Sequence, residues 1–270
     1  DLQRHLLRVI GDPIRRFEED PVRMLRAVRF AVRLNLRMER RIESVLPDLA
    51  GLLVHVPPAR LFDEVLKIFH GGHGYAAYEQ LQRFGLLAEL FPESVRAHTK
   101  VDLDPDHGLV SLALRNTDHR LAGGQPVIPA FLFAVMLWRA VCLETDQNQH
   151  RGMAPVQSLH RAIGTVIGRQ QQRVTISKRV ATTMFDMWNL QHWLLERRPR
   201  LVPKTLAHKR FRAAYDFLML RISAGEATVE VGTWWTRIQE VDGPTRRKMI
   251  TELTVPQKRG RPRHRRRKTA

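Results

Sequence analysis

The chain has 270 residues, enough for one large or two medium-sized domains, and 43% of them are hydrophobic, enough to bury a core. Its 45 Lys and Arg residues against 27 Asp and Glu give a formal net charge of +18. A charge of this size does not decide the fold, but it favours a polyanionic partner, nucleic acid before a membrane surface. The plain alternative is a protein that only tolerates a high charge.

Cys142 is the only cysteine, which excludes a disulfide framework and a cysteine-based metal site within one chain. This usage is typical of a reducing compartment, so we expect a cytoplasmic protein. Asp1 stands where a Met would begin a chain, and no basic-then-apolar leader follows it, so we expect further protein upstream. The apolar stretch 128–143 is interrupted by Arg139 and is shorter than a membrane span, so we predict a buried core helix and no membrane partner.

The first clear helix follows the sequence EEDPVRMLRAVRFAVRL. Asp20 suits the N-cap position and Pro21 the first turn. Apolar residues recur with helical period along one side of this segment, and arginines recur along another. A second helix is predicted to start at Pro58 and to stop at the glycine pair 71–72, the usual way a helix ends.

A third helix is predicted over 74–84 and a short one over 86–92, while 100–107 and 121–126 have the Asp, Gly and Pro content of loops. Further helical periodicity covers 108–120, 128–146, 155–173, 177–197, 209–223 and 229–240. No segment alternates as a strand would. The pattern therefore predicts an all-α fold, an extended array of helices without a sheet.

Three parts are predicted along the chain: a neck domain over 1–100 that contains the first clear helix, a helical body over 101–255, and a basic tail over 256–270. The tail carries eight Lys or Arg, no acidic residue and almost nothing apolar, so we expect it to be disordered on its own. Flexible arginines neutralise phosphates without a fixed pose. We therefore expect RNA binding from the arginines of the tail, which are Arg259, Arg261, Arg263, Arg265, Arg266 and Arg267.

The sharpest local signal is the pair Asp20 and Arg23, three residues apart at a helix start, so that both side chains share a face. A carboxylate beside a guanidinium offers an acceptor next to donors. This order complements adenine, which presents an amino donor beside a ring-nitrogen acceptor; guanine and uracil present the reverse order. Cytosine presents the same order as adenine, so the pair does not separate ATP from CTP. A capping Asp with an ordinary salt bridge to Arg is the structural alternative.

The run VIGDPIRRFEEDPVRMLRAVRFAVRL resembles the neck of the class II nucleotidyltransferases, which comprise bacterial poly(A) polymerases and CCA-adding enzymes. The resemblance implies that the EDxxR motif, here Glu19, Asp20 and Arg23, reads the base of the incoming nucleotide, and that Arg26 contributes to binding it. It also implies that the helix over ARLFDEVLK, with Arg60 and Glu64, braces the reading helix. The variants EDPVRMLRAVRF and PPARLFDEVLK and the Arg-rich tail favour the poly(A) polymerase branch.

The resemblance covers almost the whole chain but lacks the family's catalytic head, whose glycine-rich phosphate loop carries a Gly-Ser and whose strand carries two metal-binding Asp. No Gly-Ser dipeptide occurs in this chain. Two-metal phosphoryl transfer needs carboxylates on a rigid element, so we expect no catalytic residue and no metal site here. ATP as substrate and Mg²⁺ are expected in the complete enzyme, with the missing nucleotidyltransferase head as a partner of this chain.

The implied function is the addition of A residues from ATP to RNA 3′ ends. A CCA-adding enzyme acting on tRNA is the first alternative, because it uses the same neck. A helical RNA-binding protein without catalytic activity is the second alternative, from another functional class.

For three further sets of residues, a structural role is favoured over a chemical one. The alternating acids Asp102, Asp104 and Asp106 look like a solvated loop rather than a metal site. His70 and His73 flank two glycines, as at a helix end, and no other zinc-ligand pattern converges on them. Four of the five tryptophans could stack on bases, but each of the four lies in an amphipathic helix, which favours core packing; they are Trp188, Trp193, Trp234 and Trp235.

Overall fold

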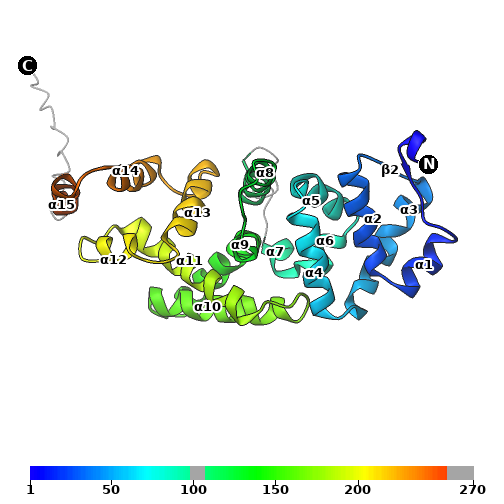
Figure 1. Ribbon diagram of the computed structural model, residues 1–270. Helices are drawn as coiled ribbons and strands as arrows, with labels where there is room; N and C mark the ends of the chain where they lie inside the picture. The colour runs from blue at the N-terminus through cyan, green and yellow to red at the C-terminus, as the bar shows by residue number, and fades with distance from the viewer. Residues whose placement is uncertain (98–106, 254–270) are drawn as a thin grey trace, which may run out of the picture.

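The computed structural model describes residues 1–97 and 107–253, and within them the chain forms an elongated array of α-helices (Figure 1). Before the gap the helices are α1 (Pro13–Glu19), α2 (Val22–Arg33), α3 (Arg40–Leu49), α4 (Pro58–Phe69), α5 (Gly74–Arg83), α6 (Leu86–Leu90) and α7 (Pro92–Ala97). After it they are α8 (Leu109–Ala122), α9 (Pro129–His150), α10 (Pro155–Gln171), α11 (Lys178–Glu196), α12 (Val202–Leu206), α13 (Phe211–Ser223), α14 (Val229–Glu240) and α15 (Gly243–Glu252). The all-α prediction is confirmed.

The described residues also contain two short 3-10 segments and one very small sheet. The 3-10 segments are Leu2–Arg4 and Ala50–His55. Strand β1 (Leu6–Leu7) pairs in parallel with β2 (Arg37–Met38). The expectation of no sheet was therefore wrong, although each strand has only two residues. Strands this short leave no room for the alternation that predicts a strand from sequence.

The start of α2 differs in one respect from the sequence prediction. Asp20 lies in extended backbone between α1 and α2, and its side chain caps neither helix. The carboxylate is instead engaged by an arginine from α4, described below. Side-chain capping occurs one helix earlier, where Asp12 accepts hydrogen bonds from the backbone N–H groups of Ile14 and Arg15 at the start of α1.

The predicted start and end of α4 and the predicted end of α5 are confirmed. Helix α4 begins at Pro58 after Pro57, where a missing N–H costs nothing. It ends before the glycine pair, and Gly72 has a φ of +81°, a conformation that a side chain would disfavour. Gly85, with a φ of +73°, separates α5 from α6 in the same way.

One large hydrophobic core runs through most of the array, from Phe17 in α1 to Leu220 in α13. Helix α9 lies in its middle, and residues 132–138 of this helix are all buried. The predicted core helix is thus confirmed. No helix within 1–97 or 107–253 combines the length and apolarity that crossing a bilayer requires.

A second, smaller core holds the C-terminal helices. It is built around Trp235 of α14, Leu194 of α11 and Phe211 of α13. The large core continues across residue 100, from α7 to α8 and α9. The division into a neck over 1–100 and a body over 101–255 stays a prediction.

Two of the four tryptophans are core residues, as the amphipathic pattern favoured. Trp188 and Trp235 are completely buried, and their indole N–H groups donate to the carbonyl oxygens of Ala134 and Leu194. Trp193 and Trp234 are partly buried and pack against the smaller core. The predicted basic tail and the acids at 102–106 lie outside the described residues.

Candidate nucleotide-recognition site

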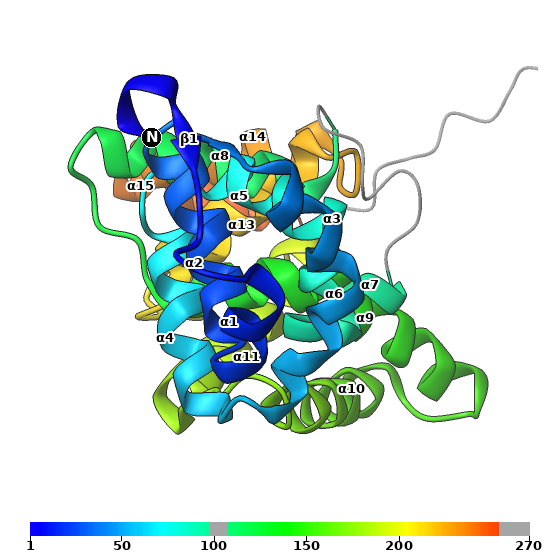
Figure 2. The same ribbon diagram turned by 90° about the vertical axis from the view of Figure 1, so that its right-hand side faces the viewer.

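The candidate site lies where α1, α2 and α4 meet, at the end of the array that faces the viewer in Figure 2. Helices α1 and α2 are joined by Asp20 and Pro21 alone, so the carboxylates of α1 meet the first turn of α2. Helix α4 packs along α2 and presents Arg60 and Glu64 to it. The structure therefore places the six residues that were expected at this site in two clusters on these helices, one around Asp20 and one around Glu64.

Asp20 is the centre of the first cluster. Its Oδ2 accepts a hydrogen bond from Arg60 Nη2 at 2.8 Å and lies 4.0 Å from Arg23 Nε. The side chain is only 17% exposed, and its other oxygen, Oδ1, is buried without a hydrogen-bond partner among the described residues. A buried carboxylate oxygen left unpaired is costly, so an acceptor is held ready at this position.

Arg23 is held from the opposite side. Its Nη1 donates to Glu19 Oε2 at 2.9 Å and to the carbonyl oxygen of Arg16 at 2.9 Å. Arg16 Nη1 donates to the same Glu19 oxygen at 2.6 Å. The hydrogen bond from Arg23 holds the pKa of the Glu19 carboxyl below its usual value. Glu19 thus stays ionised and keeps the Arg23 guanidinium beside Asp20.

Glu64 is the centre of the second cluster. It is 2% exposed, and three cations surround it: Lys67 Nζ lies at 2.8 Å from Oε1, Arg26 Nε at 3.7 Å from Oε1, and Arg29 Nε at 3.7 Å from Oε2. A buried carboxylate is tolerated only when it is paired in this way. Glu64 therefore fixes α4 against the arginine-bearing side of α2.

Sequence reasoning missed three residues of these clusters: Arg16, Arg29 and Lys67. Two of them carry a sequence signal, because Arg16 precedes Glu19 by three residues and Lys67 follows Glu64 by three, the spacing of helix neighbours. Arg29 is one turn beyond Arg26 and differs from it only by burial, 15% exposed against 42%. That difference depends on how α4 docks, which spacing does not reveal.

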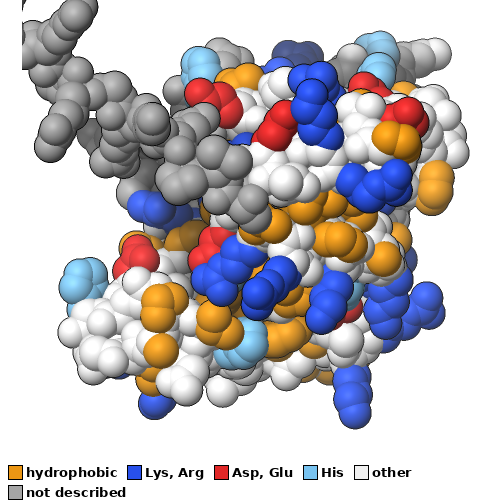
Figure 3. Space-filling model, turned by 90° about the vertical axis from the view of Figure 1, so that its left-hand side faces the viewer, with side chains coloured by type: hydrophobic (Ala, Val, Ile, Leu, Met, Phe, Trp, Pro, Cys, Tyr) orange, Lys and Arg blue, Asp and Glu red, His pale blue; other side chains and the backbone are white. Residues whose placement is uncertain are grey.

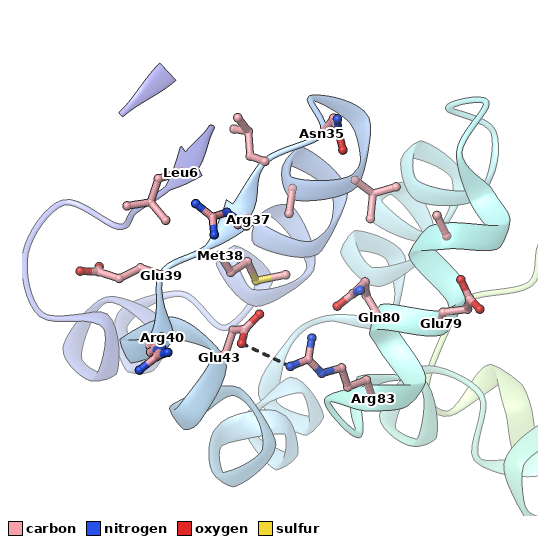
Figure 4. A pocket seen from close by; sticks show the side chains of 14 residues that line it. Leu6, Asn35, Arg37, Met38, Glu39, Arg40, Glu43, Glu79, Gln80 and Arg83 are labelled. Atoms are coloured by element: carbon pink, nitrogen blue, oxygen red, sulfur yellow. Dashed lines mark hydrogen bonds and ion pairs between the residues drawn. The ribbon is translucent and has the colours of Figure 1, made fainter. Parts of the chain in front are cut away.

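A separate cleft of about 790 Å³ lies behind this region, between the small sheet and α5. Figure 4 shows Arg37 and Met38 of β2 and Glu43 of α3 on one side, with Gln80 and Arg83 of α5 on the other. Glu43 and Arg83 meet across it at 3.3 Å. None of the predicted site residues lines this cleft.

The described residues do not gather a metal-binding group: in 1–97 and 107–253, no three His, Cys, Asp or Glu side chains lie close enough to hold one ion. His70 follows the last turn of α4, and His73 precedes the first turn of α5. The two clusters at α1, α2 and α4 hold a buried acceptor at Asp20 and ion-paired guanidinium groups.

Known protein families match this chain over two long segments. Two family models match: "Probable RNA and SrmB-binding site of polymerase A" over residues 35–97 and "Polymerase A arginine-rich C-terminus" over residues 151–269. Poly(A) polymerase I of Salmonella typhi is 38% identical over 257 residues, which are 94% of this chain and 55% of that protein. The chain belongs to the bacterial poly(A) polymerase family, and it spans about half the length of the curated relative.

More distant matches are consistent with this assignment. A CCA-adding enzyme of Lactobacillus helveticus is 38% identical, but only over 79 residues, 29% of this chain and 20% of that enzyme. A solved structure titled "tRNA-processing enzyme (apo form I)" aligns with a TM-score of 0.56 at 19% identity, covering 94% of this chain and 64% of its own. At that identity the structural match concerns the fold alone.

Proposed function

We propose that this chain selects the base of ATP for the addition of A residues to RNA 3′ ends, with Asp20 and Arg23 as the reading pair. The observation that carries the proposal is the unpartnered, buried Oδ1 of Asp20 beside the fixed guanidinium of Arg23. The Asp20 oxygen would accept from the adenine amino group, and Arg23 would donate to the neighbouring ring nitrogen. Guanine and uracil would place an acceptor against the carboxylate and be rejected.

The other residues of the two clusters act in the proposal as positioning residues. Arg60 holds the second oxygen of Asp20, so the free oxygen keeps its direction. Glu19 holds Arg23, and Glu64 holds Arg26 at the side of α2. Arg26 is 42% exposed, and in the proposal it contacts the nucleotide while it stays paired with Glu64. A site whose side chains are locked by neighbours loses little entropy when the base arrives.

The choice between ATP and CTP does not follow from this pair, because cytosine has the same donor and acceptor order. Family membership supports ATP, since the relative matched along 94% of the chain is named Poly(A) polymerase I. The CCA-adding enzyme remains the second candidate, favoured by the matched 79 residues and by the base-order argument itself.

In the proposed reaction the RNA 3′-hydroxyl attacks the α-phosphate of ATP and pyrophosphate leaves. The described residues offer no carboxylate cluster for Mg²⁺, and the chain covers 55% of the matched Poly(A) polymerase I. We assign the metal-assisted chemistry to a nucleotidyltransferase head outside this chain. The part played here is to hold the adenine and to guide the RNA. We place this activity in the cytoplasm, in line with the single, unpaired cysteine.

RNA is the proposed macromolecular partner. The formal charge of +18 supports it, and Figure 3 shows Lys and Arg side chains around a hydrophobic band at the C-terminal end of the array. One of the two family models carries RNA binding in its description. We extend the proposal to the arginines of residues 256–270, which would add affinity for phosphates without sequence preference.

The proposed function can be tested with a chimera in which this chain replaces the matching region of Poly(A) polymerase I from Salmonella typhi. The chimera is supplied with ATP and CTP, a generic RNA and a tRNA that lacks its CCA end, with the unmodified enzyme as control. The proposal predicts long A tracts on the generic RNA. A single CCA end on the tRNA, with nothing added to generic RNA, would establish the CCA-adding alternative. A folded chimera that binds RNA and transfers nothing would favour the non-catalytic RNA-binding protein.

A further inference from the structure

A second cleft lies far from the reading pair, where α8, the start of α9 and α13 come together. Helices α8 and α13 neighbour one another and both contact α9 (Figure 1). The cleft measures about 240 Å³. One of its walls is apolar and the other is cationic, and they come from different segments of the chain.

The apolar wall is formed by Ile128 and Phe131 with Ala113 and Ala213. Ile128, 40% exposed, is one of the large hydrophobic side chains that the fold leaves in solvent. The Phe131 ring is fixed edge-on against the buried Phe217, with ring centroids 6.3 Å apart. An exposed aliphatic side chain beside a fixed aromatic ring offers a flat, sequence-tolerant surface to a nucleobase.

The cationic wall is formed by Lys209, Arg210 and Arg212 at the entry to α13, with Arg120 opposite on α8. Asp216 offsets part of this charge: its carboxylate lies 3.1 Å from Arg212 and 3.9 Å from Arg120. No carboxylate among the described residues pairs with Lys209 or Arg210. Two cations of this wall are therefore not neutralised by the described part of the chain.

Arg210 supplies a further observation, because its Nε is buried and has no hydrogen-bond partner among the described residues. A buried guanidinium nitrogen without an acceptor costs free energy that a bound anion would recover. Helix α13, 13 residues long, begins next to it without a side-chain cap, so the positive end of the helix faces the same wall. The side-chain charge of Arg210 and the positive end of α13 thus favour the binding of an anion at the cationic wall.

We propose that this cleft binds one nucleotide of a single-stranded RNA, with the phosphate at Lys209 and Arg210 and the base on Ile128 and Phe131. The inference rests on the proposed function, since it takes RNA as the partner, and adds a defined subsite in the body of the array. We prefer an RNA strand to free ATP as the ligand of this cleft, because the cationic wall presents two unpaired cations, enough for one bridging phosphate. A triphosphate would bring more charge than the cleft can match.

The test measures binding of a fluorescein-labelled oligoadenylate to the 270-residue chain by fluorescence anisotropy across a salt series. Ile128→Glu places a carboxylate on the base surface, and Val229→Glu, at an apolar residue 69% exposed on α14, is the matched control. Lys209→Gln removes one phosphate contact, with Lys204→Gln on α12 as its control. All four positions lie outside the two hydrophobic cores, and the side chains of Ile128 and Val229 are exposed, so the variants should fold.

Ile128→Glu is expected to weaken oligoadenylate binding about tenfold or more relative to Val229→Glu, the range of a lost base contact. Lys209→Gln is expected to reduce the slope of log affinity against log salt by about 0.7, and Lys204→Gln to leave the slope unchanged. Equal losses within each matched pair would overturn the subsite while leaving the proposed function in place. A loss for labelled ATP as large as the loss for RNA would overturn the assignment to a strand. Failure of the unmodified chain to bind RNA at all would count against RNA as the partner in the proposed function.

Discussion

The carboxylates of the candidate site each lie near more than one cation, and this sharing sets how the residues respond to substitution. Glu64 is the extreme case, with Arg26, Arg29 and Lys67 around one buried side chain. Removing one partner from a buried cluster leaves the charges of the others uncompensated. The free-energy cost of these charges exceeds the stabilisation that the ion pair contributed. The burial of Glu64 therefore makes it a structural residue of the site as well as a proposed positioning residue.

Glu64→Gln is expected to lower the free energy of unfolding by about 1–3 kcal/mol, because three cations lose their shared carboxylate. Urea denaturation followed by circular dichroism measures this change. Asp63→Asn, an exposed neighbour on α4, is the control and should stay within about 0.5 kcal/mol. Equal stability of the two variants would mean that Glu64 contributes nothing to the docking of α4 on α2.

Cys142 gives a second prediction at the scale of one residue. Burial in α9 raises the pKa of its thiol to about 12, so almost none of the reactive thiolate exists at neutral pH. We expect the native chain to react slowly with Ellman's reagent and the urea-unfolded chain to react at the rate of a free thiol. A native rate equal to the unfolded rate would contradict the packing of α9.

At this scale the sequence predicted the proximity of Asp20 and Arg23, because a three-residue spacing at a helix start is a local property. It did not predict the contact between Arg60 and Asp20, which are 40 residues apart and meet only when α4 packs on α2. The capping role expected for Asp20 failed for the same reason: a long-range arginine engages the carboxylate that a local N–H would otherwise take.

At the scale of elements, a polar side chain of α8 contacts the start of α5. Asp118 of α8 accepts hydrogen bonds from the backbone N–H groups of Gly74 and Tyr75 at 2.7 Å and 3.0 Å. These are the first amides of α5, so Asp118, a residue of another helix, takes the role of the N-cap residue. The cap also ties a helix of the N-terminal region to one that follows the gap at 98–106.

Asp118→Ala is expected to destabilise the chain by about 1 kcal/mol, the usual loss on removing a cap. Asp118→Asn should lose less, because the amide oxygen still accepts one hydrogen bond. Thermal unfolding of both variants measures the order. A more stable Ala variant than Asn variant would show that the cap is not what Asp118 contributes.

Helices α2 and α11 could be predicted from the sequence, since each carries an apolar side that repeats over several turns, and α9 could be predicted from its continuous apolar stretch. Helices α1, α3, α7, α12 and α15 were not predicted. Helices α1 and α12 are too short for periodicity to emerge, and α3 contains Pro47, which sequence reasoning treats as a break. Their positions are decided by packing against neighbours, which a single sequence does not display.

Across the whole molecule, the two hydrophobic cores divide the array unequally. The large core joins α1 to α11 and part of α13, whereas α14 and α15 depend on the smaller one. Helix α15 contributes one buried residue, Met249. Local stability follows the number of buried apolar contacts, so it should fall toward the C-terminal end.

Amide hydrogen exchange is expected to be slowest in α9 and α4 and markedly faster in α14 and α15. Mass spectrometry of peptides from the exchanged chain measures this order, and peptides from α5 serve as an internal reference within the large core. Protection of α14 equal to that of α9 would mean that the two cores open as one cooperative unit.

We propose that the free carboxylate oxygen of Asp20 selects the base, and nucleotide selection by the chimera with Salmonella typhi Poly(A) polymerase I tests this role. Asp20→Asn keeps the shape and can still accept from Arg60, but its amide presents a donor where the adenine amino group would approach. We predict that the preference for ATP over GTP and UTP falls by about 10-fold or more, the worth of one charged hydrogen bond, while Asp63→Asn leaves it unchanged. An Asp20→Asn chimera that incorporates ATP with undiminished preference would contradict the account.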